Sequence, residues 1–271
     1  MKPKLVVVDL DGTVVGHDTR YIPPTPAVVK AIAEVRAAGV PVAVATGRSV
    51  WSALLTIADL GISDGVVSTT HGAITYDLDS GSIVNRIALD PADAVRRFTE
   101  ADESVAFAVE VDERGWYHTE NFRRDFETSW AEIVEPDVLS GMPAVRLVAR
   151  VPQMVYRGMG VPCPDSARLA AAAALDPASY HVEAGYNGWI DIGPAGVNKA
   201  TGVAAMAKHY GVSAADTVVF GDANNDLPMF GWAGHAVAMG QATDNVKAAA
   251  DEVAPSVYED GVASVLRRWF G

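Results

Sequence analysis

The sequence is poor in cysteine: Cys163 is the only one in 271 residues. A single thiol excludes an internal disulfide and a cysteine-rich metal site. The first ten residues also lack a secretion signal, because their short apolar run is interrupted by Asp9 and falls far below the ~7–15 apolar residues that a signal peptide needs. We therefore expect a protein of the reducing cytoplasm.

Long apolar runs and a surplus of positive charge are absent as well. No stretch approaches the ~18 consecutive apolar residues of a membrane-spanning helix. The 34 acidic residues outnumber the 21 lysines and arginines, which gives a formal net charge of -13, and no basic cluster stands out. Such a chain repels nucleic-acid phosphates and anionic membranes, so we expect neither nucleic acid nor a membrane as a partner.

The length and composition are typical of a globular protein with two domains. Hydrophobic residues make up 49% and charged residues 20% of the chain, which is enough apolar material for a sizeable core. Apolar strand-like runs alternate with helix-like segments at both ends of the chain, a pattern that predicts an open parallel α/β sheet. The expected strands are 4–10, 40–45, 65–68, 217–220 and 236–239, and the expected helices include 26–38, 49–60 and 199–210.

The middle of the chain has a different pattern. Residues 74–76 and 82–87 flank Asp79-Ser80-Gly81 as the strands of a β-hairpin would. From there to about residue 188, short alternating runs mix with one alanine-rich helical stretch, and the parallel alternation resumes at Trp189. We expect an α/β fold: a Rossmann-like core with an open parallel sheet, residues 1–88 and 189–271, into which an α+β domain, residues 89–188, is inserted.

Two acidic clusters follow strands of the expected core sheet. Asp9 and Asp11 come directly after the first strand, and Gly221–Asp226 follows the strand 217–220. In an open α/β sheet, ligands bind at the carboxyl ends of the strands, so both clusters are expected at the same binding edge. Oxygen ligands gathered without histidine or thiolate suit a hard cation, and Mg²⁺ is the ion that fits best.

Residues suited to phosphate lie between these clusters in the sequence. Thr46, Gly47 and Arg48 follow the strand 40–45 and offer a hydroxyl and backbone amides, and Lys199 begins a helix and adds a positive charge. Each feature alone has an ordinary structural explanation: an Asp-Gly turn, a Thr46 helix cap or a solvated lysine. All of them in order, each at a strand end or a helix start, favour a phosphate-processing site instead.

Four short segments carry a resemblance to a known family. They are Asp9–Thr13 (DLDGT), Ala45–Arg48 (ATGR), Gly196–Lys199 (GVNK) and Gly221–Asp226 (GDANND). Together they resemble the motifs of the haloacid dehalogenase-like phosphohydrolase superfamily, and the size and place of the insert resemble its Cof-type subfamily, which has a large α+β cap. The sequence departs from that subfamily at His71-Gly72-Ala73, where many members carry Asn-Gly-Ala, which removes the basis for a substrate contact at position 71.

The resemblance implies a Mg²⁺-dependent phosphatase that works through an aspartyl-phosphate. Asp9 would attack phosphorus as the nucleophile, and Asp11 would protonate the leaving oxygen and then take a proton from water. The implied metal ligands are the Asp9 carboxylate, the Asp11 backbone carbonyl and Asp222, with Asp226 as a further ligand or as the neighbour of one. The implied phosphate contacts are Thr46, Gly47, Lys199 and Asn225.

The expected partner is a small-molecule phosphate ester, such as a sugar phosphate. Two alternatives remain open: a phosphosugar mutase or phosphotransferase that uses the same Asp9, and a binding protein built on a catalytically inactive core. The sequence indicates neither the leaving group nor the oligomeric state. It places His17, just after the first motif, in a solvated loop.

Overall fold

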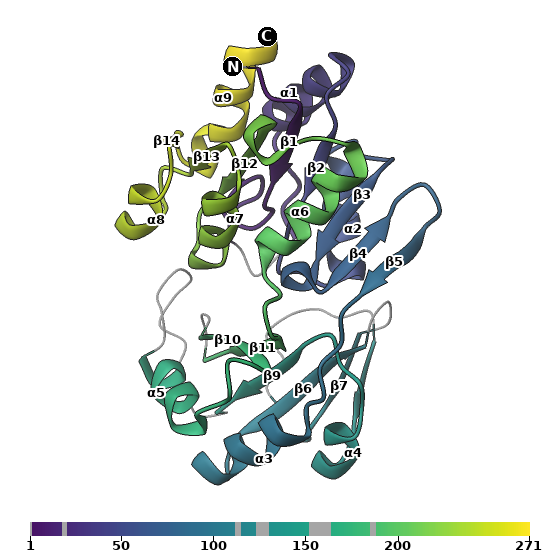
Figure 1. Ribbon diagram of the computed structural model, residues 1–271, viewed down its shortest axis with the longest axis vertical. Helices are drawn as coiled ribbons and strands as arrows, with labels where there is room; N and C mark the ends of the chain where they lie inside the picture. The colour runs from purple at the N-terminus through teal and green to yellow at the C-terminus, as the bar shows by residue number, and fades with distance from the viewer. Residues whose placement is uncertain (1, 18–20, 112–114, 123–129, 152–163, 185–187) are drawn as a thin grey trace. The chain divides into compact units, whose positions relative to one another are not determined.

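The computed structural model describes residues 2–17, 21–111, 115–122, 130–151, 164–184 and 188–271 (Figure 1). Cys163 lies outside these residues. The chain divides into two compact units, which are Met1–Asn85 with Asn198–Gly271, and Arg86–Val197. No helix within the described ranges is long and apolar enough to cross a membrane.

The first unit is built on a five-stranded parallel sheet in the order β14-β13-β12-β1-β2. Its strands are β1 (Leu5–Val8), β2 (Val42–Val44), β12 (Thr217–Gly221), β13 (His235–Ala238) and β14 (Glu252–Val253). β1 pairs with β12 on one side and with β2 on the other, so that Val7 lies opposite Val219 and Ala43. Every residue of β1 is buried, as expected of a strand covered on both faces.

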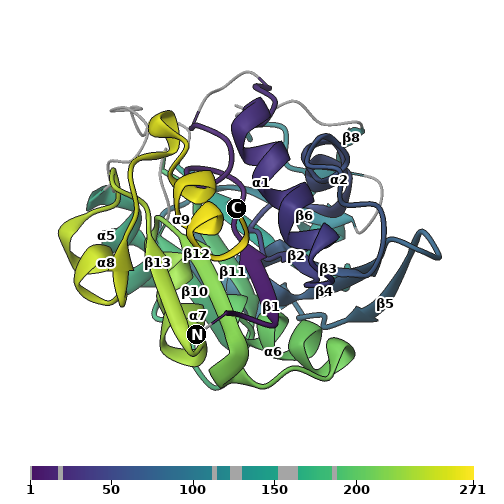
Figure 2. The same cartoon turned by 90° about the horizontal axis from the view of Figure 1, so that it is seen from above.

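Helices cover both faces of this sheet (Figure 2). They are α1 (Pro26–Ala37), α2 (Val50–Asp59), α6 (Lys199–Tyr210), α7 (Leu227–Trp232), α8 (Asp244–Ala248) and α9 (Gly261–Phe270). Helices α1, α2 and α9 share a core with Val6 and Val8, whereas α6, α7 and α8 share one with Leu5 and Val7. Alternate residues of β1 therefore point into two separate cores, and the predicted α/β fold with a parallel sheet is confirmed.

A smaller sheet of three strands also belongs to the first unit, apart from its last residue, Arg86. It contains β3 (Val66–Thr69), β4 (Ile74–Asp77) and β5 (Ser82–Arg86), in that order. β3 pairs antiparallel with β4, and an isolated parallel bridge from Ala45 to Ser68 links it to the chain that leaves β2. The predicted hairpin is confirmed, whereas the segment 65–68, expected in the parallel sheet, forms part of this smaller sheet.

The second unit is an α+β domain. Its strands are β6 (Ala106–Val111), β7 (Gly115–His118), β8 (Ala131–Ile133), β9 (Leu147–Arg150), β10 (Tyr180–Ala184) and β11 (Ile190–Pro194). They form one sheet in the order β10-β11-β9-β6-β7-β8, which is antiparallel except between β7 and β8. Helices α3 (Ala92–Ala101), α4 (Pro136–Ser140) and α5 (Pro164–Ala173) contribute to a common core with this sheet.

The position of β11 differs from the expectation drawn from the sequence. We expected the core to resume at residue 189, but β11 pairs antiparallel with β10 and β9, and the chain returns to the first unit at Asn198. Burial along β11 alternates, because Ile190 and Ile192 are buried and Asp191 is only half-buried. Such alternation is typical of an antiparallel strand with one covered face. The first boundary lies after Asn85 rather than after residue 88.

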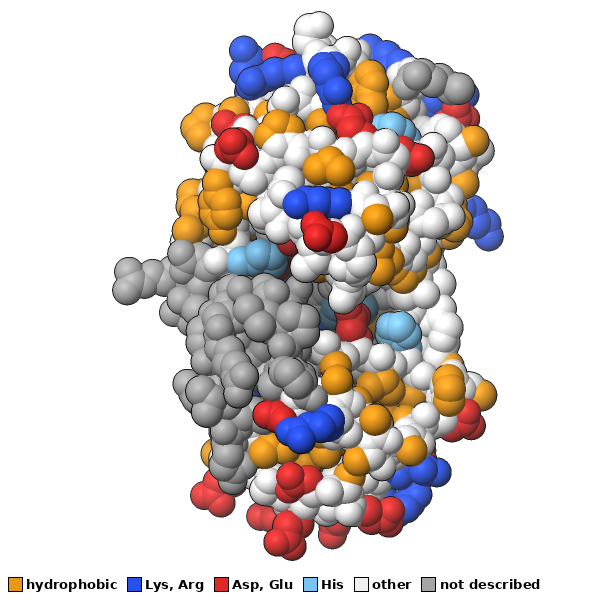
Figure 3. Space-filling view, turned by 90° about the vertical axis from the view of Figure 1, so that its left-hand side faces the viewer, with side chains coloured by type: hydrophobic (Ala, Val, Ile, Leu, Met, Phe, Trp, Pro, Cys, Tyr) orange, Lys and Arg blue, Asp and Glu red, His pale blue; other side chains and the backbone are white. Residues whose placement is uncertain are grey.

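Charge on the surface follows the composition. On the face drawn in Figure 3, basic side chains are interspersed with acidic and neutral ones.

Candidate active site

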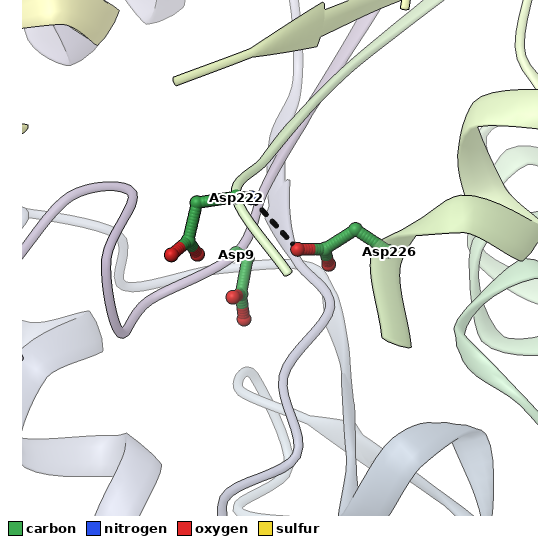
Figure 4. Close-up of side chains that lie close together, drawn as sticks. All are labelled: Asp9, Asp222 and Asp226. Atoms are coloured by element: carbon green, nitrogen blue, oxygen red, sulfur yellow. Dashed lines mark hydrogen bonds between the residues drawn. The ribbon is translucent and has the colours of Figure 1, made fainter. Parts of the chain in front are cut away.

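Three acidic side chains meet at the carboxyl ends of β1 and β12 (Figure 4). Asp9 follows β1, Asp222 follows β12, and Asp226 ends the short 3₁₀ helix Asn224–Asp226. Because β1 and β12 are parallel neighbours, their ends bring Asp9 and Asp222 together. One oxygen of each carboxylate lies within 4.8 Å of the other two, and all three residues are buried. The two acidic clusters of the sequence thus meet at one edge of the sheet.

Lys199 lies inside this cluster. The side chain of Asn198 caps α6 by accepting hydrogen bonds from the backbone N–H groups of Ala200 and Thr201, which fixes Lys199 as the first helical residue. Its Nζ lies 2.9 Å from Asp9 Oδ1 and 2.6 Å from Asp226 Oδ1, and the residue is only 1% exposed. Lys199 is therefore a buried counter-charge and not a solvated surface lysine.

Both oxygens of Asp226 have hydrogen-bond donors. Oδ1 accepts a hydrogen bond from Lys199 Nζ, and Oδ2 accepts hydrogen bonds from the backbone N–H groups of Asp222 and Ala223 at 2.9 and 3.0 Å. Gly221 makes room for this arrangement, because a Cβ there would lie 2.4 Å from Asp226 Cγ. Asp226 therefore orients both Lys199 and the loop that carries Asp222.

With all three carboxylates ionised, the cluster would hold more negative than positive charge, since they face one ammonium group. Burial, opposed by Lys199 and reinforced by the charges of Asp226 and Asp222, raises the pKa of the Asp9 carboxyl from 3.8 to about 8. Burial also raises the pKa of Asp222. A divalent cation bound to these oxygens would offset the excess negative charge, so the donor set fits a hard cation such as Mg²⁺.

The raised pKa of Asp9 makes the stability of the metal-free protein depend on pH. In the unfolded chain the Asp9 carboxyl ionises near its ordinary pKa of 3.8, whereas in the folded chain it keeps its proton to about pH 8. Between these values the unfolded state is favoured by ionisation, so the contribution of Asp9 to stability should decrease as the pH rises from about 4 to about 8. In EDTA, the variant Asp9→Asn should unfold at a higher temperature than the wild type at pH 8 and at a similar temperature at pH 4. A difference in melting temperature that does not vary with pH would contradict the raised pKa.

The structure does not bring the Asp11 carboxylate into this cluster. Among the described residues, the carboxylates that meet are those of Asp9, Asp222 and Asp226. The Asp11 carboxylate instead accepts two hydrogen bonds from the Arg48 guanidinium. The metal contact expected of Asp11 involves its backbone carbonyl, so the pairing of its side chain with Arg48 leaves that expectation unchanged.

The loop after β1 folds back onto Asp222. His17 Nε2 lies 2.9 Å from Asp222 Oδ2, and Thr13 Oγ1 donates to Asp222 Oδ1 at 3.4 Å. Gly12 has a φ of +79°, and a Cβ there would lie 2.1 Å from Asp222 Oδ2, so this close approach requires glycine. The expectation of a solvated loop at His17 is wrong, because its side chain is 22% exposed and is hydrogen-bonded to Asp222.

The other expected phosphate contacts follow β2 and β12. Thr46 Oγ1 accepts a hydrogen bond from the Arg48 backbone N–H at 3.1 Å, so this hydroxyl shapes the turn and does not cap α2. Gly47 contacts the ring of His71, where a Cβ would lie 2.5 Å from a ring carbon. The side-chain oxygen of Asn225 is buried and has no hydrogen bond to any described residue. A hydroxyl, backbone amides and a carboxamide are therefore available at this end of the sheet.

Arg48 and His17 bind carboxylates of the site through their side chains, whereas the sequence pointed only to the backbone of Arg48 and placed His17 in a solvated loop. For Arg48 a signal is present, because a charged side chain within a motif at the binding edge needs a counter-charge nearby. For His17 the sequence offers only its closeness to Asp11. Its contact with Asp222 depends on a turn that brings the loop back to β12.

Known proteins are similar to this chain in sequence and in fold. The model of the haloacid dehalogenase-like hydrolase family matches residues 6–266. The 5-amino-6-(5-phospho-D-ribitylamino)uracil phosphatase YitU of Bacillus subtilis is 28% identical over an alignment of 283 positions, which covers 99% of this chain and 98% of YitU. The phosphoglycolate phosphatase of Archaeoglobus fulgidus is 27% identical over 266 residues, which cover 98% of this chain and 96% of that protein. The solved structure of BT4131, a sugar phosphatase of haloacid dehalogenase subclass IIB, has the same fold, with a TM-score of 0.78 and 22% identity over 98% of both chains.

Proposed function

Because the chain belongs to the haloacid dehalogenase-like hydrolase family, we propose that it is a Mg²⁺-dependent phosphatase of small phosphorylated metabolites, sugar phosphates among them. YitU and the Archaeoglobus enzyme are named as phosphatases of small phosphate esters, and BT4131 as a sugar phosphatase. The observation that carries the proposal is the buried contact of Lys199 with Asp9, 2.9 Å apart, inside a cluster of carboxylates. A nucleophile, a positive charge for phosphate and oxygen ligands for a metal would then share one site.

The reaction we propose has two displacements at phosphorus. In the first, an Asp9 oxygen attacks phosphorus, the bond from phosphorus to the leaving oxygen breaks, and Asp11 gives its proton to that oxygen. In the second, a water oxygen attacks the phosphorus of the aspartyl-phosphate, the bond to Asp9 breaks, and Asp11 takes a proton from the water. Inorganic phosphate leaves, and both aspartates return to their starting state.

The remaining residues of the site would bind the phosphoryl group and the metal. The nonbridging oxygens carry negative charge in the transition state, and donors aimed at them lower its energy. We assign this role to Lys199, Thr46, Gly47 and Asn225. A bound Mg²⁺ would offset the repulsion between the Asp9 carboxylate and the phosphate dianion. The residues that would hold it are Asp9, Asp222 and Asp11, the last through its backbone carbonyl, with Asp226 beside them.

We further propose that the second unit, Arg86–Val197, acts as a cap that restricts the enzyme to small substrates. The residues assigned to catalysis and to phosphate all lie in the first unit, so the inserted domain is free for substrate selection. A domain that closes over a reaction site excludes water and strengthens the electrostatic contacts inside it. A phosphate group on the surface of a folded protein would not fit beneath such a cap.

A substrate panel tests the proposed function. Phosphate release should be measured with several sugar phosphates, phosphoglycolate, p-nitrophenyl phosphate and a folded phosphoprotein, with Mg²⁺ present. We expect release from the small esters and none from the phosphoprotein. An Asp9→Asn sample purified in the same way controls for contaminating phosphatases. Isomerisation of a phosphosugar without phosphate release would favour a mutase, and inactivity on every ester would favour a binding protein. A phosphoprotein hydrolysed as fast as the best small ester would contradict the cap.

A further inference from the structure

The contact between Arg48 and Asp11 engages both oxygens of a carboxylate that the proposed function uses. Arg48 Nε donates to Asp11 Oδ2 at 2.7 Å, and Nη2 donates to Oδ1 at 2.5 Å, so one planar fork holds the whole carboxylate. We propose that Arg48 is a positioning residue for Asp11, which sets the place and direction of the acid–base group. This inference rests on the proposed function, in which Asp11 transfers the protons.

The guanidinium group is itself anchored on its other side. Arg48 Nη1 donates to Thr56 Oγ1 at 2.9 Å and to the Ser52 carbonyl at 3.4 Å, and both partners belong to α2. The main chain of Arg48 is also fixed, because its carbonyl accepts a hydrogen bond from the Thr70 N–H at 2.8 Å. An arginine held in this way transmits the position of a rigid helix to the Asp11 carboxylate.

The backbone next to Asp11 is fixed by separate contacts. The Gly12 N–H donates to the Val15 carbonyl at 2.7 Å, and Gln241 Nε2 donates to the Gly12 carbonyl at 2.5 Å. The Asp11 side chain is 41% exposed, so packing alone does not determine its torsion angles. Rotation of this side chain is therefore the freedom that the Arg48 fork restricts.

The fork also constrains how Asp11 transfers a proton. With both oxygens accepting from Arg48, neither carries the transferred proton. One of the two hydrogen bonds therefore has to open before an Asp11 oxygen can hold the proton that it gives to the leaving oxygen, or take a proton from the water. The other hydrogen bond would keep the carboxyl group in place during the transfer. A lysine at position 48 would supply a point charge without the planar fork, and so would hold Asp11 with less control of its direction.

Stabilisation of the fold explains the ion pair of Arg48 with Asp11 less well. Ion pairs near the surface contribute little to folding. The chain offers a matched pair for comparison, Arg36 with Asp64, whose atoms Nη2 and Oδ2 are 2.9 Å apart and whose side chains are 23% and 60% exposed. Arg36 has no contact with the residues assigned to catalysis among those that the structure describes. Removing Arg36 therefore controls for the loss of an arginine and of an ion pair.

The test is a set of variants in the full-length chain. Arg48→Met and Arg48→Lys are each made in the wild-type chain and in the variant Asp11→Asn. The kcat and KM of each protein are measured with a sugar phosphate and with p-nitrophenyl phosphate. Arg48→Met should lower kcat for the sugar phosphate about 10- to 100-fold, since misplaced acid–base groups cost this much, with little change in KM. The loss should be smaller for p-nitrophenyl phosphate, whose leaving group departs without a proton. Arg48→Lys should lower kcat less than Arg48→Met does, and Arg36→Met should leave kcat unchanged for both substrates.

The double variants identify what Arg48 acts through. In the Asp11→Asn background, Arg48→Met should lower kcat less than about twofold, because the group that Arg48 positions is already lost. An equal loss of kcat in both backgrounds would overturn the inference, since Arg48 would then act on the substrate itself. A change confined to KM would also overturn it. If Arg48→Met does not fold, Thr56→Val removes only the hydroxyl anchor and should give a smaller loss with the same preference for the sugar phosphate; an unchanged kcat would overturn the inference. A wild-type protein that is inactive on every ester would overturn the proposed function, whereas the outcomes above overturn only the role of Arg48.

Discussion

Replacing Asp9 with asparagine is expected to lower phosphate release by at least about 10³-fold on every substrate, since loss of a nucleophile usually costs several orders of magnitude. The amide keeps the shape of the side chain but cannot form the acyl phosphate. Lys199 keeps its contact with Asp226 at 2.6 Å, so the rest of the site should remain in place. The measurement is steady-state phosphate release by both proteins, with thermal unfolding to show that the variant is folded.

Asp216 provides the matched control for this substitution. It lies just before β12, at the opposite end of the strand from Asp222, and pairs with Lys4 at 3.1 Å. Asp216→Asn removes a carboxylate from the same unit without touching the acidic cluster, and its activity should stay within about twofold of the wild type. Residual turnover of Asp9→Asn above about a thousandth of the wild-type rate would contradict a nucleophilic role and would favour direct attack by water.

Removal of divalent cations is the second change with a large expected effect. EDTA should reduce phosphate release to background, and added Mg²⁺ should restore it. The physical reason is that Asp9 has to be ionised to attack phosphorus. Three ionised carboxylates would then face the ammonium group of Lys199, and their excess negative charge would repel a phosphate dianion. Ca²⁺ should inhibit the enzyme, because its larger and looser coordination misplaces the nucleophile and the phosphate.

Metal binding has a readout that does not depend on activity. Circular dichroism in EDTA should show a folded protein, and Mg²⁺ should raise its melting temperature because the ion binds the folded state. The rise should be smaller for Asp222→Asn, which removes one of the proposed ligands. Full turnover in excess EDTA, or a melting temperature that does not respond to Mg²⁺, would contradict the metal site.

Local sequence predicts the part of the site that depends on strand ends. β1 and β12 are short apolar runs, each followed at once by acidic residues, and parallel neighbours bring such residues together at one edge. The helix cap before Lys199 is likewise a local signal, and it places this lysine at the start of α6. The family indicated by the four motifs is confirmed.

Features that depend on distant partners could not be predicted in this way. The pairing of Asp11 with Arg48 joins side chains on two different loops, and no periodic pattern in the sequence predicts such a pairing. The same holds for β11, because its apolar residues are compatible with the parallel sheet of the first unit and with the sheet of the second. Its pairing with β9 and β10 places it in the second. Its alternation of buried Ile190 and Ile192 with half-buried Asp191 is the signal that distinguishes it from a strand of the core.

Trapping the covalent intermediate tests the proposed chemistry most directly. The protein is mixed with a phosphate ester that carries a radioactive phosphoryl group and is quenched in acid within one turnover, and the label bound to the chain is then measured. The aspartyl-phosphate mechanism predicts label on the wild-type protein that maps to Asp9, that hydroxylamine releases, and that is absent from Asp9→Asn. Phosphate release at the wild-type rate without any label on the chain, or label that persists in Asp9→Asn, would contradict it.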